Sequence, residues 1–324
     1  MFKKDIPIAI GIYLLLLLII NKVFNFQPPA WASILFYLLI YAGVSAALSR
    51  WNPEIKEAEP EEELPTSGPI GRFGQAGLIF TFSITGLLSL LNPFQLLQII
   101  LQGIGNVWLQ LTVGNQENNN NPPLNQAVYT LPFAGEWYIY NGGITPKTSH
   151  SWGALTQRYA YDFLQVDKQM KRHSGTGTQL TDYYCFNQNI LSAADGTIVK
   201  VVDRVRSAPF LGYGLVDFLA THFVGNHVII QHAENEYGLY AHLIKGTIPV
   251  KIGDAVSRGQ VIGQCGHSGH SSEPHLHFHL QDKANFYFAM GLPIQFSDVN
   301  VDGKAVESAY IQVGNHVSSA GKSI

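Results

Sequence analysis

Histidine occurs at every second position in the segment 274–280, which reads PHLHFHL. Side chains alternate between the two faces of a β-strand, so a strand here would present His275, His277 and His279 on one face and apolar residues on the other. A catalytic zinc takes about three protein ligands, often imidazole nitrogens, and keeps one position open for water. The segment therefore predicts part of a metal site, whose other ligands must come from elsewhere in the chain.

Two further strand-like segments each set one polar side chain opposite an apolar face. In 158–163 (RYAYDF), aromatic residues alternate with a set that includes Asp162, and in 237–243 (YGLYAHL), aliphatic residues alternate with His242. His150 lies upstream of both segments. The chain has no His-Glu-x-x-His motif, which excludes the commonest helical metalloprotease site.

The order of these segments resembles that of the M23 peptidases, the lysostaphin- and LytM-type zinc endopeptidases that cut peptidoglycan peptides. The matching blocks are His150, YAYDF at 159–163, GNHVII at 225–230, LYAHL at 239–243, VKIGD at 250–254, RGQVIG at 258–263 and PHLHF at 274–278. The resemblance covers roughly residues 128 to 285, about half of the chain, with every block in the family's order.

The resemblance implies that His150, Asp162 and His277 bind Zn²⁺, and that His242 and His275 are the catalytic histidines around the zinc-bound water. It implies hydrolysis of amide bonds in peptidoglycan stem peptides or cross-bridges. The alternative is a degenerate, non-catalytic domain that binds and regulates a cell-wall hydrolase or another envelope partner. Such domains lose metal ligands, whereas all five positions hold competent residues here, which favours an enzyme.

This chain departs from the family pattern at several histidines. His150 and Asp162 are separated by more than the usual spacing of about four residues, because of an insertion. His279 stands where many relatives have Glu, and we expect either a contact with the metal ligands or substrate, or a partly exposed ring with no role. His267 and His270 flank a Gly/Ser turn and are expected to be solvated, the alternative being part of a substrate groove.

The elements that must position these residues are mainly strands. Residues 189–266 contain short apolar runs separated by Gly-containing turns, which favours an antiparallel sheet or open barrel. The family fold is lysostaphin/LytM-like and related to the barrel-sandwich hybrid of biotinyl and lipoyl carriers. A non-catalytic carrier module is the alternative function for this domain, but such a module does not require a His-x-His strand. We expect the peptidase domain at 127–312 and a flexible tail at 313–324.

A membrane region is predicted at 1–113. Apolar segments occur at approximately 5–24, 30–49 and 77–101, and the first two each approach the ~20 residues that span a bilayer. A signal peptide is the alternative for the first segment, but no clear small-residue cleavage site follows it. The third crosses Pro93, which can kink a membrane helix without ending it, and the stretch 103–113 would lie along the interface or extend the span.

Charge gives the predicted orientation. Lys3 and Lys4 lie before the first segment, Arg50, Lys56 and Arg72 lie between the second and third, and after the third no Lys or Arg occurs before Lys147. The positive-inside tendency places the N-terminus and the acidic linker 50–72 in the cytoplasm. Three spans would then place the catalytic domain on the extracytoplasmic side of the membrane, where peptidoglycan lies.

Composition limits the remaining possibilities. The Asn/Pro-rich stretch 114–126 is expected to be a flexible tether. A formal net charge of −3 gives no basic signature for a nucleic-acid partner. Cys185 and Cys265 both fall in the exported domain, where a disulfide is permitted, but their spacing does not show whether they pair. The expected partners are peptidoglycan peptides and, through the N-terminal helices, the lipid bilayer.

Overall fold

The computed structural model describes residues 67–113 and 124–320, all within one compact unit, Pro60–Ile324. The predicted spans at 5–24 and 30–49 lie outside the described residues, as do most of the linker 50–72 and of the tether 114–126.

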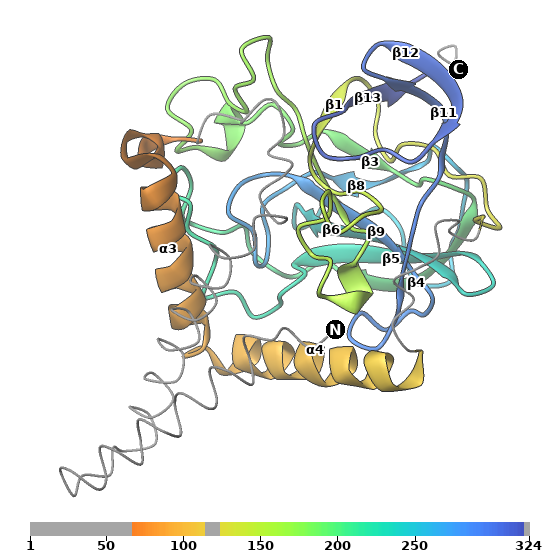
Figure 1. The fold of residues 1–324 in the computed structure, drawn as a ribbon, viewed down its shortest axis with the longest axis horizontal. Coiled ribbons are helices and arrows are strands. Elements are labelled where there is room, and N and C mark those ends of the chain that lie inside the picture. The colour runs from red at the N-terminus through yellow and green to blue at the C-terminus, as the bar shows by residue number, and fades with distance from the viewer. Residues whose placement is uncertain (1–66, 114–123, 321–324) are drawn as a thin grey trace, which may run out of the picture. The chain divides into compact units, whose positions relative to one another are not determined.

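Helices come first in the described part, and a mainly β domain follows them (Figure 1). The helical elements are the 3₁₀ helix η2 (Pro69–Phe73), α3 (Gly74–Ser89), α4 (Pro93–Thr112), η3 (Leu155–Gln157) and η4 (Leu180–Asp182). The strands are β1 (Trp137–Asn141), β2 (Tyr161–Leu164), β3 (Asn189–Leu191), β4 (Gly196–Val202), β5 (Asn226–Ala233), β6 (Glu236–Leu243), β7 (Ala255–Val256), β8 (Val261–Gln264), β9 (Leu276–Gln281), β10 (Gly291–Leu292), β11 (Phe296–Val301), β12 (Lys304–Ala309) and β13 (His316–Ser319).

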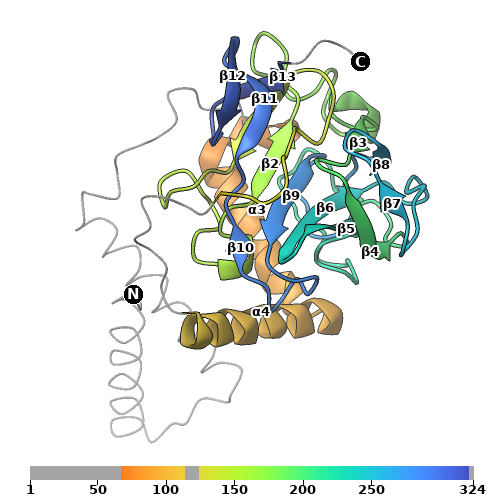
Figure 2. The same cartoon turned by 90° about the vertical axis from the view of Figure 1, so that its right-hand side faces the viewer.

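The strands of the described residues form an 11-stranded sheet and a separate two-stranded sheet, β3-β8. The order in the large sheet is β12-β11-β13-β1-β2-β9-β6-β5-β4-β7, and β10 pairs with β9. All of these strand pairs are antiparallel, which confirms the prediction of a mainly antiparallel β domain. β2, β9 and β6 are neighbours in the sheet (Figure 2), although they come from distant parts of the chain.

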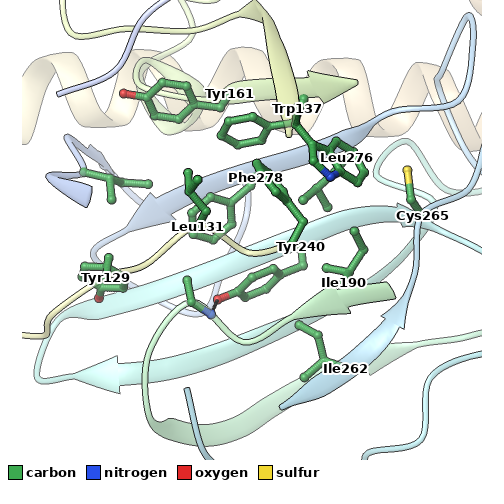
Figure 3. Packing of buried hydrophobic residues seen from close by; sticks show 14 of the residues in the cluster. Tyr129, Leu131, Trp137, Tyr161, Ile190, Tyr240, Ile262, Cys265, Leu276 and Phe278 are labelled. Atoms are coloured by element: carbon green, nitrogen blue, oxygen red, sulfur yellow. Dashed lines mark hydrogen bonds between the residues drawn. The ribbon is translucent and has the colours of Figure 1, made fainter. Parts of the chain in front are cut away.

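The hydrophobic core lies against one face of these three strands (Figure 3). Tyr161 and Phe163 of β2 are fully buried in it, as is Phe278 of β9. Asp162 and His277 alternate with these residues and project from the other face. The predicted alternation of apolar and polar residues is therefore confirmed for both strands.

Phe278 links the core directly to the strand that carries the histidines, and its ring lies 4.7 Å from that of Tyr240 between centroids. We expect Phe278→Ala to lower the free energy of unfolding by ~3–5 kcal/mol, because a large cavity would remain in a closely packed interior. Val306→Ala, at an exposed position of β12, should change it by less than ~0.5 kcal/mol. Urea denaturation of the full chain measures both, and equal effects would contradict the core assignment.

The prediction of a flexible tail at 313–324 is wrong for the residues up to Ser319. β13 pairs with both β1 and β11, and Val317 stands opposite Trp137 on one side and Val301 on the other. Val317 is fully buried, so this short segment is stabilised by the sheet even though its sequence is mostly polar. The last residues of the predicted tether are also bound to the domain, because Asn125 donates to the Pro293 carbonyl oxygen.

The segment predicted to span the membrane at 77–101 is not one straight helix. It covers most of α3 and the first part of α4, and the two helices meet at a 97° bend. Asn92 caps α4 by accepting a hydrogen bond from the Phe94 N–H, and Pro93 fits the first helical turn, where no N–H partner is needed. Within residues 67–113 and 124–320, no single helix is both long and apolar enough to cross a membrane, although the bent pair together meets that standard.

Candidate active site

β2, β9 and β6 bring three of the predicted site residues to a common cleft of about 600 Å³. Asp162 and His277 are directly paired across β2 and β9, so they share a face of the sheet. His242 comes from β6, while His150 and His275 enter the cleft from the loops that precede β2 and β9. The structure thus brings all five predicted residues together.

Three imidazole nitrogens surround the Asp162 carboxylate. His277 Nδ1 lies 3.0 Å and His275 Nε2 3.6 Å from Oδ1, and His150 Nε2 lies 3.6 Å from Oδ2. The Asn141 side chain donates to Oδ2 at 2.9 Å. Burial raises the pKa of Asp162, but the hydrogen bond with His277 and the adjacent histidines outweigh it and hold the pKa well below its ordinary value. Asp162 is therefore ionised at neutral pH.

His242 reaches the cleft through an unusual backbone conformation. Tyr240 stands opposite Phe278 in the core, so regular alternation would turn His242 toward the core as well. Instead His242 has φ +62°, a left-handed value that is uncommon outside glycine. Its ring lies 4.7 Å from that of His275 and 5.8 Å from that of His277, between centroids. Alternation in the sequence therefore predicts His242 as a site residue, but it is the positive φ that places its ring in the cleft.

Backbone carbonyls set the tautomers of His242 and His275. Nδ1 of His242 donates to the Ser268 carbonyl at 2.8 Å, and Nδ1 of His275 donates to the Glu273 carbonyl at 2.8 Å. Because a carbonyl can only accept, each neutral ring keeps its proton on Nδ1 and an unprotonated Nε2. Burial, together with the neighbouring histidines, lowers the pKa of His242 well below its ordinary value. His242 is thus a neutral imidazole whose Nε2 can accept a proton.

A chain of buried hydrogen bonds sets the opposite tautomer in His277. The Gln281 amide donates to the Lys283 carbonyl, so its oxygen accepts from His279 Nε2–H at 2.9 Å. Burial lowers the pKa of His279 to about 3, so this ring is neutral and its Nδ1 accepts from His277 Nε2–H at 3.0 Å. In neutral His277 the lone pair is therefore on Nδ1.

That tautomer makes His277 Nδ1 and Asp162 Oδ1 two acceptors only 3.0 Å apart. Two such atoms repel unless they share a proton, as in the hydrogen bond between His277 and Asp162 described above, or a metal ion. Donors that bind a tetrahedral zinc at ~2.0–2.1 Å lie about 3.3 Å from each other, close to the 3.0 and 3.6 Å that separate His277 and His150 from Asp162. The donor chemistry fits zinc, while the two distances are to different oxygens of the Asp162 carboxylate. No set of three or more His, Cys, Asp or Glu side chains in the described ranges is gathered as a complete metal site.

A folded loop takes up the insertion between His150 and β2. The Ser149 hydroxyl donates to the Arg158 carbonyl at 2.6 Å, and the Ser151 hydroxyl donates to the Gln157 carbonyl at 2.5 Å. These bonds fold the chain back on itself, so that His150 returns to the start of β2. Ser149 and Ser151, on either side of His150, are a signal in the sequence for such a loop. The sequence does not show which carbonyl oxygens these hydroxyls bind.

The remaining histidines near the cleft are more buried than expected. His267 is fully buried with Nδ1 2.8 Å from the Ser271 hydroxyl, and His270 stacks on Phe223 with 4.4 Å between centroids. The prediction that these two are solvated is wrong, because their turn is bonded to neighbouring loops, for example through His270 N–H and the Phe223 carbonyl. His279 is fully buried in contact with His277, so the alternative of a partly exposed ring is also wrong.

The two cysteines are buried free thiols in the described structure. The Cys185 thiol donates to the Pro274 carbonyl at 3.1 Å, just before the histidine strand. Burial raises the pKa of Cys265. A neutral buried thiol is a poor metal ligand, which favours a packing role for Cys265.

The hydrogen-bond chain yields a prediction about metal affinity. His279→Leu removes the acceptor that orients His277, so we expect zinc affinity to fall by ~10–100-fold. His279→Gln keeps an acceptor oxygen and should retain most of the affinity. Competition with a colorimetric zinc chelator measures both variants, and circular dichroism checks their folding. Equal affinity in the leucine variant and the wild type would show that His279 does not support the ligand.

Comparison with known proteins places the cleft in context. Residues 173–287 match the sequence profile described as peptidase family M23. The matched range contains His242, His275 and His277 and begins after His150 and Asp162.

Individual relatives match over limited lengths. The chain is 28% identical over 167 residues to the peptidoglycan DD-endopeptidase ShyA of Vibrio cholerae, covering 52% of this chain and 30% of the relative. It is 45% identical over 91 residues to an uncharacterized metalloprotease of Buchnera aphidicola, covering 28% and 19%. The chain therefore spans less than a third of these curated relatives. The catalytic domain of lysostaphin from Staphylococcus simulans superposes with a TM-score of 0.28 at 20% identity, covering 49% of this chain and 88% of that domain.

Proposed function

Because residues 173–287 of this chain match peptidase family M23, we propose that the chain is a zinc metalloendopeptidase that hydrolyses amide bonds of peptidoglycan stem peptides or cross-bridges. The observation that carries the proposal is the gathering of three imidazole nitrogens around the ionised Asp162 carboxylate in one cleft. In this proposal His150, Asp162 and His277 hold the zinc.

Zinc, when bound, would lower the pKa of its water and polarise the scissile carbonyl. The histidines of the chain would then move the protons. Nε2 of His242 and of His275 are acceptors, because the Nδ1–H of each ring is bonded to a carbonyl. Either ring could accept a proton from the nucleophile and return it to the leaving amine. The protonated ring would also stabilise negative charge developing on the carbonyl oxygen.

Peptidoglycan as the substrate class is supported by one relative, the peptidoglycan DD-endopeptidase ShyA of Vibrio cholerae. An extracytoplasmic site of action follows from this substrate class, because peptidoglycan lies outside the cytoplasmic membrane. The apolar runs at 5–24 and 30–49 would anchor the enzyme in the cytoplasmic membrane.

Hydrolysis of purified peptidoglycan by the full chain in detergent tests the proposal. We expect soluble peptide fragments with new amino termini, detected by mass spectrometry, and their loss on adding a zinc chelator. Zinc should restore the release, and the His277→Ala variant should release none. A folded chain that is supplied with zinc and still releases no fragments would overturn the proposal that the chain is an enzyme. It would favour a non-catalytic domain that regulates another hydrolase.

A further inference from the structure

The two helices before the β domain have an unusual distribution of polarity. A helix that packs on a soluble domain normally turns its apolar stripe inward and its polar face to water. In α4 the buried side chains include Gln95 and Gln98, and the buried side chains of α3 include Thr85 and Ser89. The apolar side chains of both helices mostly face outward, so their polarity is reversed.

The inward amides of α4 make specific bonds to the loop 217–223. Asn92 donates to the Phe218 and Ala220 carbonyls at 3.1 and 3.0 Å. Gln95 donates to the Asp217 carbonyl at 2.6 Å. Gln98 donates to the Thr221 carbonyl at 3.1 Å, while its oxygen accepts from the Phe223 N–H at 2.7 Å. This face of the helix is held to the domain mainly by hydrogen bonds.

The second half of α4 contacts the loop that carries His150. Asn106 accepts from the Leu155 N–H and donates to the Gly153 carbonyl, both at 2.8 Å. At Gly105 the helix comes so close to the domain that an added Cβ would lie 1.8 Å from the Tyr287 carbonyl oxygen. Leu109 completes this face and packs with Leu155. α4 therefore has one defined orientation on the domain along its whole length.

The opposite face of α4 is a broad apolar surface. Its exposed residues include Phe94 (58% exposed), Leu97 (57%), Ile104 (53%), Val107 (56%), Trp108 (54%) and Leu111 (80%). No Lys, Arg, Asp or Glu occurs between Arg72 and Glu117. We call these six residues the outer face of α4.

The apolar, uncharged composition of the outer face of α4 favours lipid as its binding partner. In a bilayer, polar side chains must be satisfied within the protein while apolar side chains contact acyl chains, which is the arrangement observed here. Soluble partners commonly bring a polar rim, but α4 has no charged residue to meet one. The preceding sequence also contains two runs long and apolar enough to span a bilayer, at 5–24 and 30–49, so the chain is expected to be held at a membrane.

We propose that α4 lies flat in the interface of a lipid bilayer, with its outer face among the acyl chains and its amide face holding the β domain at the membrane surface. The 97° bend and the cap at Asn92 separate α4 from α3 and let it lie in the membrane plane. Trp108 suits this depth, since Trp is enriched at membrane interfaces.

A flat α4 in the bilayer interface has two consequences, one for lipid specificity and one for the position of the cleft. With no basic residue, α4 should insert equally into neutral and anionic lipid and be insensitive to salt, unlike a basic interfacial helix. The cleft would also lie close to the membrane, because Leu78, Ile79 and Phe82 of α3 and Gln102 of α4 line it.

Depth measurements on the full chain in phosphatidylcholine vesicles test the proposal. Leu97, Ile104 and Leu111 are spaced by seven residues, so they lie on the same side of the helix at intervals of about 10 Å along its axis. Each would be changed singly to Cys and labelled with a nitroxide, since the native Cys185 and Cys265 are buried. Collision with oxygen and with a water-soluble nickel complex reports the depth of the label. Val306→Cys on β12 is the matched exposed control.

For a flat α4 we expect the three labels at one common depth, roughly 5–10 Å below the headgroups, unchanged by anionic lipid, and the Val306 label in water. Depths that change by about 10 Å from one label to the next would show a broken transmembrane span and overturn the proposal. Labels that are open to the nickel complex, or shielded from both reagents by another part of the protein, would also overturn it. None of these outcomes depends on whether the chain hydrolyses peptidoglycan.

Discussion

Replacing His277 by alanine should abolish zinc retention. His277 Nδ1 is the nitrogen closest to Asp162, and the His279–Gln281 chain keeps the lone pair of the neutral ring on that atom. The loss should exceed the ~10–100-fold reduction in affinity that follows loss of an outer-shell partner, because a direct ligand is removed. Elemental analysis after dialysis against metal-free buffer measures the bound zinc.

His316→Ala is the matched control, because His316 lies on β13, where it pairs with Tyr138 of β1, away from the cleft. This variant should keep its zinc. If His277→Ala also retained a full equivalent of zinc, His277 would be removed from the set of ligands. Loss of zinc from both variants would instead point to general unfolding.

Replacing His242 by alanine should have the opposite signature, with zinc retained and hydrolysis reduced by ~10²–10⁴-fold. The reason is that Nδ1 of His242 is bonded to the Ser268 carbonyl, which leaves Nε2 as a proton acceptor beside His275. Initial rates of peptide release from peptidoglycan, with zinc content measured on the same samples, separate the two effects.

The backbone at His242 calls for a second variant. Since its φ is +62°, the loss of activity in an alanine variant could come from a changed backbone. His242→Asn addresses this, because asparagine tolerates the left-handed region better than most residues. It should show the same retained zinc and the same loss of activity. Loss of zinc in both variants would make His242 a ligand, and full activity in both would exclude it from the chemistry.

The strands of the site could be predicted from the sequence because their pattern is regular. In β2 and β9, alternation alone places Asp162 and His277 on one face and their apolar neighbours in the core. Two features escaped this reasoning because they depend on irregular backbone or on distant partners. His242 is turned into the cleft by a positive φ, and His150 is brought there by hydroxyl bonds within a loop.

Elsewhere the structure differs from the prediction where polar residues are stabilised by tertiary contacts. β13 is short and mostly polar, and it pairs because β1 and β11 offer free edges on either side. The apolar segment 77–101 was expected to be one span, but the Asn92-Pro93 cap starts a new helix there. The glutamines of α4 gave a signal in the sequence, since they recur on one side of the helix, but their partners lie more than 100 residues away.

Zinc content of the purified full chain tests the central claim most directly. Elemental analysis should find about one zinc per chain, removable by a chelator and restored by zinc addition, because one catalytic zinc site of three protein ligands is expected. A folded chain that binds no zinc under these conditions would contradict the claim that His150, Asp162 and His277 form a metal site.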